Sequence, residues 1–145
     1  MRKVTLTRYR MIITSVWWGG GLAIILAFIW VTLDDSNFGA FGSQALDWLL
    51  PHILPTMTLT GAVAYSRPAE TDGPVTKQIR FAFALACLIS VFYLLLLLLI
   101  TGFTLMGTGV ESQRGIIDSL LKWNKLLGVL QGLAASAIGV FFVKH

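Results

Sequence analysis

Four long stretches of this chain carry no charged residue, and this feature constrains its fold more than any other. A bilayer core about 30 Å thick requires about 20 predominantly apolar residues per helix. A single charge at the centre of such a helix costs about 2.5–3.5 kcal/mol on insertion scales, so the absence of charge is physically significant. The uncharged stretches are Met11–Leu33, Trp48–Ser66, Phe81–Val110 and Leu126–Val143.

These stretches predict an all-α, polytopic membrane protein. We expect one transmembrane domain of four helices that covers residues 1–145. The composition agrees, because 56% of the residues are hydrophobic and only 12% are charged, whereas about 25% are charged in ordinary soluble domains. The segments between the stretches are too short and too polar to form a core of their own. The expected spans cover residues 11–33, 48–66, 81–106 and 126–143.

The first stretch has the position of a signal peptide, but we interpret it as a retained helix. The stretch from Met11 to Leu33 is longer than the apolar region of about 7–15 residues that signal peptides carry, and no small-residue cleavage site directly follows it. It contains Gly19, Gly20 and Gly21 in succession. Such a run permits either a close approach by a neighbouring helix or a bend of the helix itself.

The distribution of Lys and Arg predicts that both termini are cytoplasmic. Basic residues of short loops remain on the cytoplasmic side of a membrane. They are frequent before the first span and between the second and third spans, whereas the loop between the first and second spans has none. The loop before the last span carries both signs of charge. The expected cytosolic basic face includes Arg8, Arg10, Arg67, Lys77 and Arg80.

Two interpretations of this basic face stay open. It is typical of ordinary positive-inside topology, in which Lys and Arg contact anionic membrane lipids. It is also compatible with a docking surface for an anionic ligand such as a nucleotide or an oligonucleotide. No glycine-rich phosphate-binding loop accompanies it.

The second stretch, WLLPHILPTMTLTGAVAY, contains polar residues and prolines that a lipid-facing helix would avoid. We expect Pro51 to lie in the first turn of the span, where its missing N–H costs nothing. Pro55 lies one turn deeper and should bend the helix, because it removes a backbone hydrogen bond. Three residues spaced by four share one helix face and form a polar stripe. The stripe consists of His52, Thr56 and Thr60.

This polar stripe has two interpretations. Its threonine hydroxyls can bond to carbonyl groups of their own helix, with His52 satisfied at the outer interface. Alternatively the stripe lines a pore, and His52 tunes conductance because histidine changes its charge near neutral pH. Two amide side chains, one just before and one within the last stretch, can equally bridge helices or face water. The expected pore-lining residues are therefore His52, Thr56, Thr60, Asn124 and Gln131.

The C-terminal part of the chain predicts two further helical features. Gly128, Gly132 and Ser136 recur every four residues in the last stretch, and such small residues let helix backbones approach closely. The preceding segment, Ser112–Lys125, has apolar residues at helical spacing with charges opposite them. We expect it to form a short amphipathic helix on the outer membrane surface.

The sequence argues against an enzyme. Catalysis inside a membrane needs a convergent set of groups, such as a Ser/His pair, paired aspartates or a metal cluster. The spans hold only His52 and Cys87 as titratable candidates of that kind, so we expect no catalytic residue, cofactor or metal. The spans also lack the carboxylate that proton-coupled exporters of this size use.

Three functions from different classes fit these observations. The first is an oligomeric ion-conducting pore, which requires several copies because four helices cannot enclose a wide aqueous path, and we expect a tetramer or a nearby ring. The second is a membrane anchor or assembly subunit that holds a cytosolic partner through the basic face. The third is a holin-like lesion former that opens large, irregular holes.

The stretches WLLPHILPTMTLTGAVAY and WNKLLGVLQGLAASAIGVFF resemble small multi-span membrane effectors of bacterial anti-phage defence systems, the Hailong-type channel effector among them. The resemblance covers the second and fourth spans. It implies a homo-oligomeric channel in the bacterial inner membrane that depolarises the cell upon infection. It also implies a nucleotide or oligonucleotide as the regulatory ligand, and it assigns the gate to the second span.

Overall fold

The computed structural model describes residues 6–32, 42–66, 75–105 and 113–144, and within these ranges it consists of helices without a strand. This confirms the all-α class for the described part of the chain. The elements are α1 (Leu6–Thr32), α2 (Gly42–Ser66), α3 (Lys77–Leu105), α4 (Gln113–Lys122) and α5 (Asn124–Lys144).

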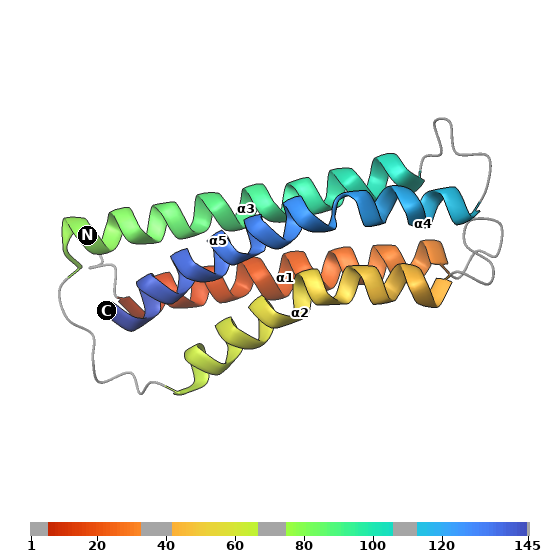
Figure 1. Cartoon of the computed structure of the whole chain (residues 1–145). Coiled ribbons are helices and arrows are strands. Elements are labelled where there is room, and N and C mark those ends of the chain that lie inside the picture. Colours follow the sequence, from red (N-terminus) through yellow and green to blue (C-terminus); the bar gives the residue numbers. More distant parts are fainter. Residues whose placement is uncertain (1–5, 33–41, 67–74, 106–112, 145) are drawn as a thin grey trace.

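The four long helices form one elongated bundle in which successive long helices run in opposite directions (Figure 1). The start of α1 and the end of α5 lie at the same end of the bundle. Helix α1 packs mainly on α2, and α3 packs mainly on α5. Helix α2 bends near its middle, and its last turns diverge from the rest of the bundle.

Among the described residues, three helices are long and apolar enough to cross a membrane. These segments are Leu6–Trp30, Lys77–Phe103 and Asn124–Phe142, which correspond to the first, third and fourth expected spans. Helix α2 does not reach the same hydropathy, because prolines, threonines and a histidine interrupt it and Gln44 and Asp47 lie in its first turns. By length and composition, the chain is a membrane protein.

Helix α2 begins earlier than its apolar stretch suggests. It starts at Gly42, so both Pro51 and Pro55 lie inside the helix. The prediction that Pro51 occupies a first turn is therefore wrong. An α-helical residue donates its N–H to the carbonyl four residues earlier, so Pro51 cannot donate to the carbonyl of Asp47. The polar residues before Trp48 extend the helix beyond the uncharged stretch.

The short helix before the last span is confirmed, but its placement differs from the expectation. Helix α4 does not cross the bundle end; it runs almost in line with α5 (Figure 1). The two helices are separated at Trp123, whose N–H donates to the Leu120 carbonyl at 3.1 Å. Ile117 and Leu120 are buried against the bundle, whereas Asp118 is exposed. The apolar face of α4 thus packs on protein.

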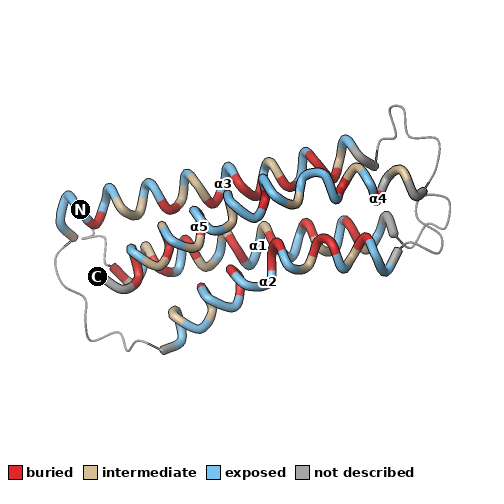
Figure 2. Tube along the Cα trace, in the orientation of Figure 1, coloured by how far each residue is buried: buried red, intermediate tan, exposed pale blue. Residues whose placement is uncertain are grey.

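The core of the bundle lies along the faces that the four long helices turn toward one another (Figure 2). Trp17 of α1 is fully buried, stacks on Tyr93 of α3 with ring centroids 5.8 Å apart, and donates its Nε1–H to Ser90 Oγ at 2.9 Å. A Cβ atom on Gly21 would lie 2.9 Å from Cγ2 of Ile53. Gly21, the last glycine of the run, therefore serves a close approach of α2 to an uninterrupted α1.

Candidate functional site

Polar side chains gather where α2 bends, and three other helices meet it there. Gln131 of α5 donates its Nε2–H to the carbonyl of Pro51 at 3.0 Å. Tyr93 of α3 donates its hydroxyl to the carbonyl of His52, also at 3.0 Å. The Nε2 of His52 lies 3.2 Å from Oδ1 of Asn124. We call the place where α2 faces α5 the α2–α5 seam, and the first and third contacts cross it.

The bond from Gln131 follows directly from the covalent structure of proline. Pro55 has no N–H, so the carbonyl of Pro51, four residues earlier, loses its intrahelical donor. Gln131 supplies a side-chain N–H to that same carbonyl. In a lipid environment a freed carbonyl needs such a substitute, because no water is available in the hydrocarbon core. The amide in the middle of α5 therefore compensates the proline in the middle of α2.

Other α2 carbonyls near the bend also accept side-chain donors. Trp18 of α1 donates its Nε1–H to the carbonyl of Met57 at 3.2 Å. Thr58 Oγ1 donates to carbonyls of its own helix, at 3.0 Å to Leu54 and 2.9 Å to Pro55. Bonds of this kind stabilise helices that prolines interrupt inside membranes. The bend of α2 is thus fixed by α1, α3 and α5 together.

The polar stripe of α2 faces the interior of the bundle. His52, Thr56 and Thr60 are 7%, 1% and 0% exposed. Thr60 Oγ1 donates to the carbonyls of Thr56 and Met57, as the first interpretation of the stripe expects. The hydroxyl of Thr56 has no hydrogen-bond partner among the described residues. A pore-lining role for the stripe stays a prediction for an assembly of several chains.

A groove of about 540 Å³ opens along the α2–α5 seam. A Cβ atom on Gly128 or Gly132 would meet no atom within 4 Å, so these glycines make no close helix approach inside the chain. Ser136, the third small residue of the series, is exposed. This small face of α5 is therefore left uncovered by the described part of the chain. The groove is lined by Pro51, Pro55, Thr56, Leu59, Gly128, Gln131, Gly132 and Ala135.

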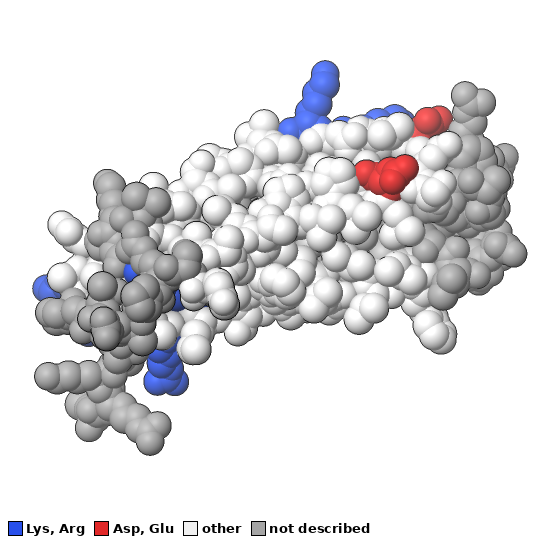
Figure 3. Space-filling model, turned by 90° about the horizontal axis from the view of Figure 1, so that it is seen from below, with Lys and Arg blue, Asp and Glu red and all other residues white. Residues whose placement is uncertain are grey.

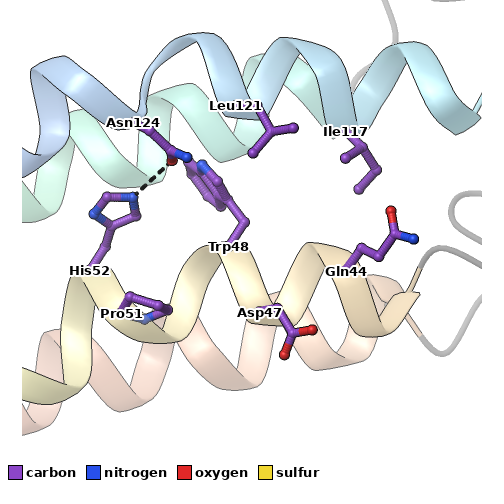
Figure 4. Close-up of a pocket in the computed structure, with 8 residues that line it drawn as sticks. All are labelled: Gln44, Asp47, Trp48, Pro51, His52, Ile117, Leu121 and Asn124. Atoms are coloured by element: carbon purple, nitrogen blue, oxygen red, sulfur yellow. Dashed lines mark hydrogen bonds between the residues drawn. The ribbon is translucent and has the colours of Figure 1, made fainter.

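A second cavity, of about 370 Å³, lies closer to α4 (Figure 4). It includes the His52 and Asn124 pair, and the indole of Trp48 contacts the imidazole edge with ring centroids 5.3 Å apart. Trp48 Nε1 and His52 Nδ1 have no hydrogen-bond partner among the described residues. The lining residues are Gln44, Asp47, Trp48, Pro51, His52, Ile117, Leu121 and Asn124.

The expected basic face is only partly present in the structure. Arg8, Lys77 and Arg80 are exposed at the end of the bundle where α1 and α3 begin, and Figure 3 shows basic side chains at that end. Arg10 is 7% exposed, so its inclusion in a solvent-facing surface is wrong. Arg10 lies on the inward face of α1 with Leu6, Ile13 and Trp17, which explains this burial. Arg67 lies outside the described residues.

No known protein helps to assign the function. Comparison with protein-family models, with curated proteins and with solved structures finds no match to this chain. Within the described residues, no group of three or more His, Cys, Asp or Glu side chains is placed to hold a metal ion. The assignment therefore depends on the geometry of the bend and the seam.

Sequence reasoning missed Tyr93, Trp17 and Ser90 as parts of this site. One signal was present, because a tyrosine in the middle of an apolar span usually bonds its hydroxyl to a partner. Nothing in the sequence indicates which main-chain carbonyl of another helix accepts this hydrogen bond.

We expect Gln131→Leu to lower the free energy of unfolding by about 1–2 kcal/mol, because it leaves the Pro51 carbonyl without a donor. In a Pro55→Ala background the same substitution should have little effect, since the restored backbone N–H at position 55 bonds to that carbonyl. The measurement is SDS-induced unfolding in mixed micelles, followed by far-UV circular dichroism, for the four members of the double-mutant cycle. Equal losses in both backgrounds would show that Gln131 acts through packing and not through this bond.

Proposed function

We propose that this protein forms a homo-oligomeric pore that conducts ions across a membrane. The observation that carries the proposal is the groove of the α2–α5 seam. There a proline-bent helix, a central amide and two open glycines face outward, at the depth of the apolar part of α5. In this proposal α2 also crosses the membrane and brings the number of spans to four, because it lies along α1 in the same bundle.

The physical argument concerns what can cover this groove. Irregular backbone at membrane depth is tolerated only where protein buries it or where it lines a water-filled cavity. The outer faces of α1 and α3 present large apolar side chains such as Leu26, Leu88 and Phe92, which suit lipid. The seam instead presents Gly128, Gln131 and small neighbours. In a ring of copies with the seam turned inward, neighbouring copies bury the irregular backbone or leave it lining a water-filled axis.

A cyclic arrangement follows from the packed interior of one chain. The bundle core is filled by Trp17, Tyr93 and other large side chains, so the described part of a single copy offers no aqueous path through its centre. Several copies around an axis create one. We propose a tetramer or a nearby ring, in the bacterial inner membrane, with both termini cytoplasmic. Anionic lipids, or a nucleotide or oligonucleotide as regulator, would then bind at Arg8, Lys77 and Arg80.

A membrane anchor for a cytosolic partner is the second candidate, and the exposed basic end favours it. The two functions respond differently to neutralisation of Arg8 and Arg80. An anchor loses its partner, whereas a pore keeps its conductance and changes only its ion selectivity or its regulation.

The test of the pore is ion flux from liposomes that contain the purified protein. We expect Gly132→Leu to reduce flux to the level of empty liposomes, because the leucine fills the groove and separates neighbouring copies. Its Cβ has open space within the chain, so the fold should persist. Gly102→Leu is the matched control. A Cβ atom there would also meet no atom within 4 Å, but Gly102 lies on α3, away from the seam.

Flux that Gly132→Leu leaves unchanged would contradict this proposal, because it would exclude the seam as the pore. Loss of flux in both variants would instead indicate a general effect of the added leucine. Planar-bilayer recordings separate a pore from holin-like lesions. A pore gives a small and reproducible unitary conductance, whereas lesions give large and variable steps.

A further inference from the structure

A groove of about 440 Å³ lies along the face where α1 and α3 are side by side. It sits near the middle of two helices that are long and apolar enough to cross a membrane. Small residues of α1 form much of one wall, and larger apolar residues of α3 form the other. The groove therefore suits a hydrocarbon chain at membrane depth. Its lining includes Gly20, Ala23 and Ala27 of α1 and Val91, Leu95 and Leu98 of α3.

The position of this groove in the bundle determines what covers it. Helix α1 packs mainly on α2 and α3, and α5 packs mainly on the same two helices, so the α1–α3 face lies opposite the α2–α5 seam. In the proposed ring the seam faces the central axis, and the groove then faces outward. A single copy in a bilayer exposes the same face. Lipid covers the groove in both cases.

One face of α3 connects this groove to the basic end of the bundle. Arg80 precedes Val91 by eleven residues and Leu98 by eighteen, which correspond to about three and five helical turns. All three side chains are exposed, so they lie along one outer face of α3. The axial distance from Arg80 to Val91 is about 16 Å. Tyr9 of α1 stacks on Phe83 of α3 with ring centroids 4.2 Å apart, so the two helices are also adjacent near the basic end.

The basic end favours an anionic group. Arg8, Lys77 and Arg80 are exposed there, whereas the only acidic side chains of the described residues, Asp47 and Asp118, lie toward the other end (Figure 3). Helices α1 and α3 both begin at the basic end (Figure 1), so the positive ends of two helix dipoles add to the charge of the side chains. An anionic lipid headgroup is therefore favoured there over a zwitterionic one.

We infer that an anionic phospholipid binds along the α1–α3 face. Its phosphate lies at Arg80, with Arg8 and Lys77 at the same end, and one acyl chain follows α3 until its last carbons enter the groove. An acyl chain fills half of a bilayer core of about 30 Å, which matches the axial distance from Arg80 to Val91. The inference rests on the proposed membrane placement of the basic end, but it does not require a pore.

A soluble anion accounts for fewer of these observations. A phosphate compound or an oligonucleotide would bind through charge alone and would leave the apolar groove in line with Arg80 without a role. A lipid uses the basic side chains and the groove together. Binding of a lipid must therefore depend both on its headgroup charge and on the length of its chains.

Native mass spectrometry of the full-length protein in detergent micelles tests the headgroup. The probes are dioleoyl phosphatidylglycerol, which is anionic, and dioleoyl phosphatidylcholine, which is zwitterionic, and we expect the anionic lipid to bind more tightly. Arg80→Gln should weaken its binding about fivefold, the effect of one basic residue near a membrane surface. Lys125→Gln is the matched control, because Lys125 is exposed at the start of α5, away from the basic end. Equal affinity for the two lipids, or an unchanged affinity in Arg80→Gln, would overturn the inference.

A second comparison tests the groove. Dioctanoyl phosphatidylglycerol keeps the headgroup, but its chains are too short to reach Val91. Ala23→Leu fills the groove, so it should weaken binding of the dioleoyl lipid about fivefold, as expected for the loss of one or two buried methylene groups, and should leave binding of the dioctanoyl lipid unchanged. Ala62→Leu is the matched control, because Ala62 is exposed on α2.

Two results of this comparison would contradict the inference. Equal binding of the dioleoyl lipid by Ala23→Leu and the unaltered protein would exclude the groove as the site of the chain. A changed oligomeric state with intact lipid binding would show that the groove is a contact between copies.

Soluble competitors separate the lipid from a free anion. Glycerol phosphate and a short oligonucleotide, each at the same concentration as the lipid, should not displace dioleoyl phosphatidylglycerol, because neither occupies the groove. Displacement by either compound would show that the basic end binds a soluble anion and would overturn the inference. None of these measurements uses ion flux, so the lipid site and the pore can fail separately.

Discussion

Trp17→Ala is expected to lower the free energy of unfolding by about 3–5 kcal/mol, the largest loss among the substitutions considered. The side chain is fully buried between α1 and α3, so its removal leaves a cavity that a packed bundle cannot fill. The substitution also removes the ring that stacks on Tyr93. Since Tyr93 donates to the His52 carbonyl, we further expect the bend of α2 to loosen.

A graded series separates packing from hydrogen bonding at this position. Trp17→Phe keeps an aromatic ring but leaves the Ser90 hydroxyl without its donor, so its loss should be smaller, about 1–3 kcal/mol. Trp30→Ala is the control, because Trp30 is 80% exposed and should change stability little. SDS-induced unfolding in mixed micelles measures all three. Similar losses for Trp17→Ala and Trp30→Ala would contradict the assigned core.

The helices themselves could be predicted from the sequence, because apolar length alone determines what crosses a membrane. The uncharged stretches that begin at Met11, Phe81 and Leu126 correspond to helices that meet this criterion. The extent of α2 could not be predicted in the same way. Asp47 bounds the uncharged stretch, but the helix extends past it and Gln44 to Gly42, since helical backbone tolerates polar side chains wherever they can remain exposed.

The candidate site was only partly predictable, because its contacts join distant parts of the chain. The sequence identified Pro55 as a bend and Gln131 as an amide in need of a partner. It could not show that Gln131 replaces the hydrogen bond that Pro55 removes. The bond from Gln131 to the Pro51 carbonyl depends on how α5 lies along α2. The same limit applies to Trp17 and Ser90, which are 73 residues apart.

The direction of the polar stripe was the hardest feature to predict. Helical periodicity places His52, Thr56 and Thr60 on one face, but periodicity does not tell whether that face meets water, lipid or protein. In the structure it meets protein, and Thr60 satisfies its hydroxyl within its own helix. The feature that faces outward is instead the neighbouring seam, where Gln131 is polar and the glycines of α5 leave open space.

Gly21→Leu is expected to destabilise the contact between α1 and α2 by about 1–3 kcal/mol or more, because the site has no room for a side chain. A Cβ atom there would lie 2.8 Å from Sδ of Met57 and 2.9 Å from Cγ2 of Ile53. The methionine can move, since its side chain is flexible. The isoleucine cannot move easily, because its branched Cβ restricts its rotamers. The backbones of α1 and α2 must therefore separate.

Gly19→Leu is the matched control for this substitution. It lies two residues earlier on the same helix, and a Cβ there would meet no atom within 4 Å. Both variants gain the same helix propensity, so any difference between them reports the packing of α2 on α1. The measurement is again unfolding in mixed micelles, with ion flux as a second readout. If α2 depends on α1 for its bent position, Gly21→Leu should alter flux and lower stability, whereas Gly19→Leu should leave flux unchanged and raise stability slightly through helix propensity alone. Equal stability of the two variants would contradict the close approach at Gly21.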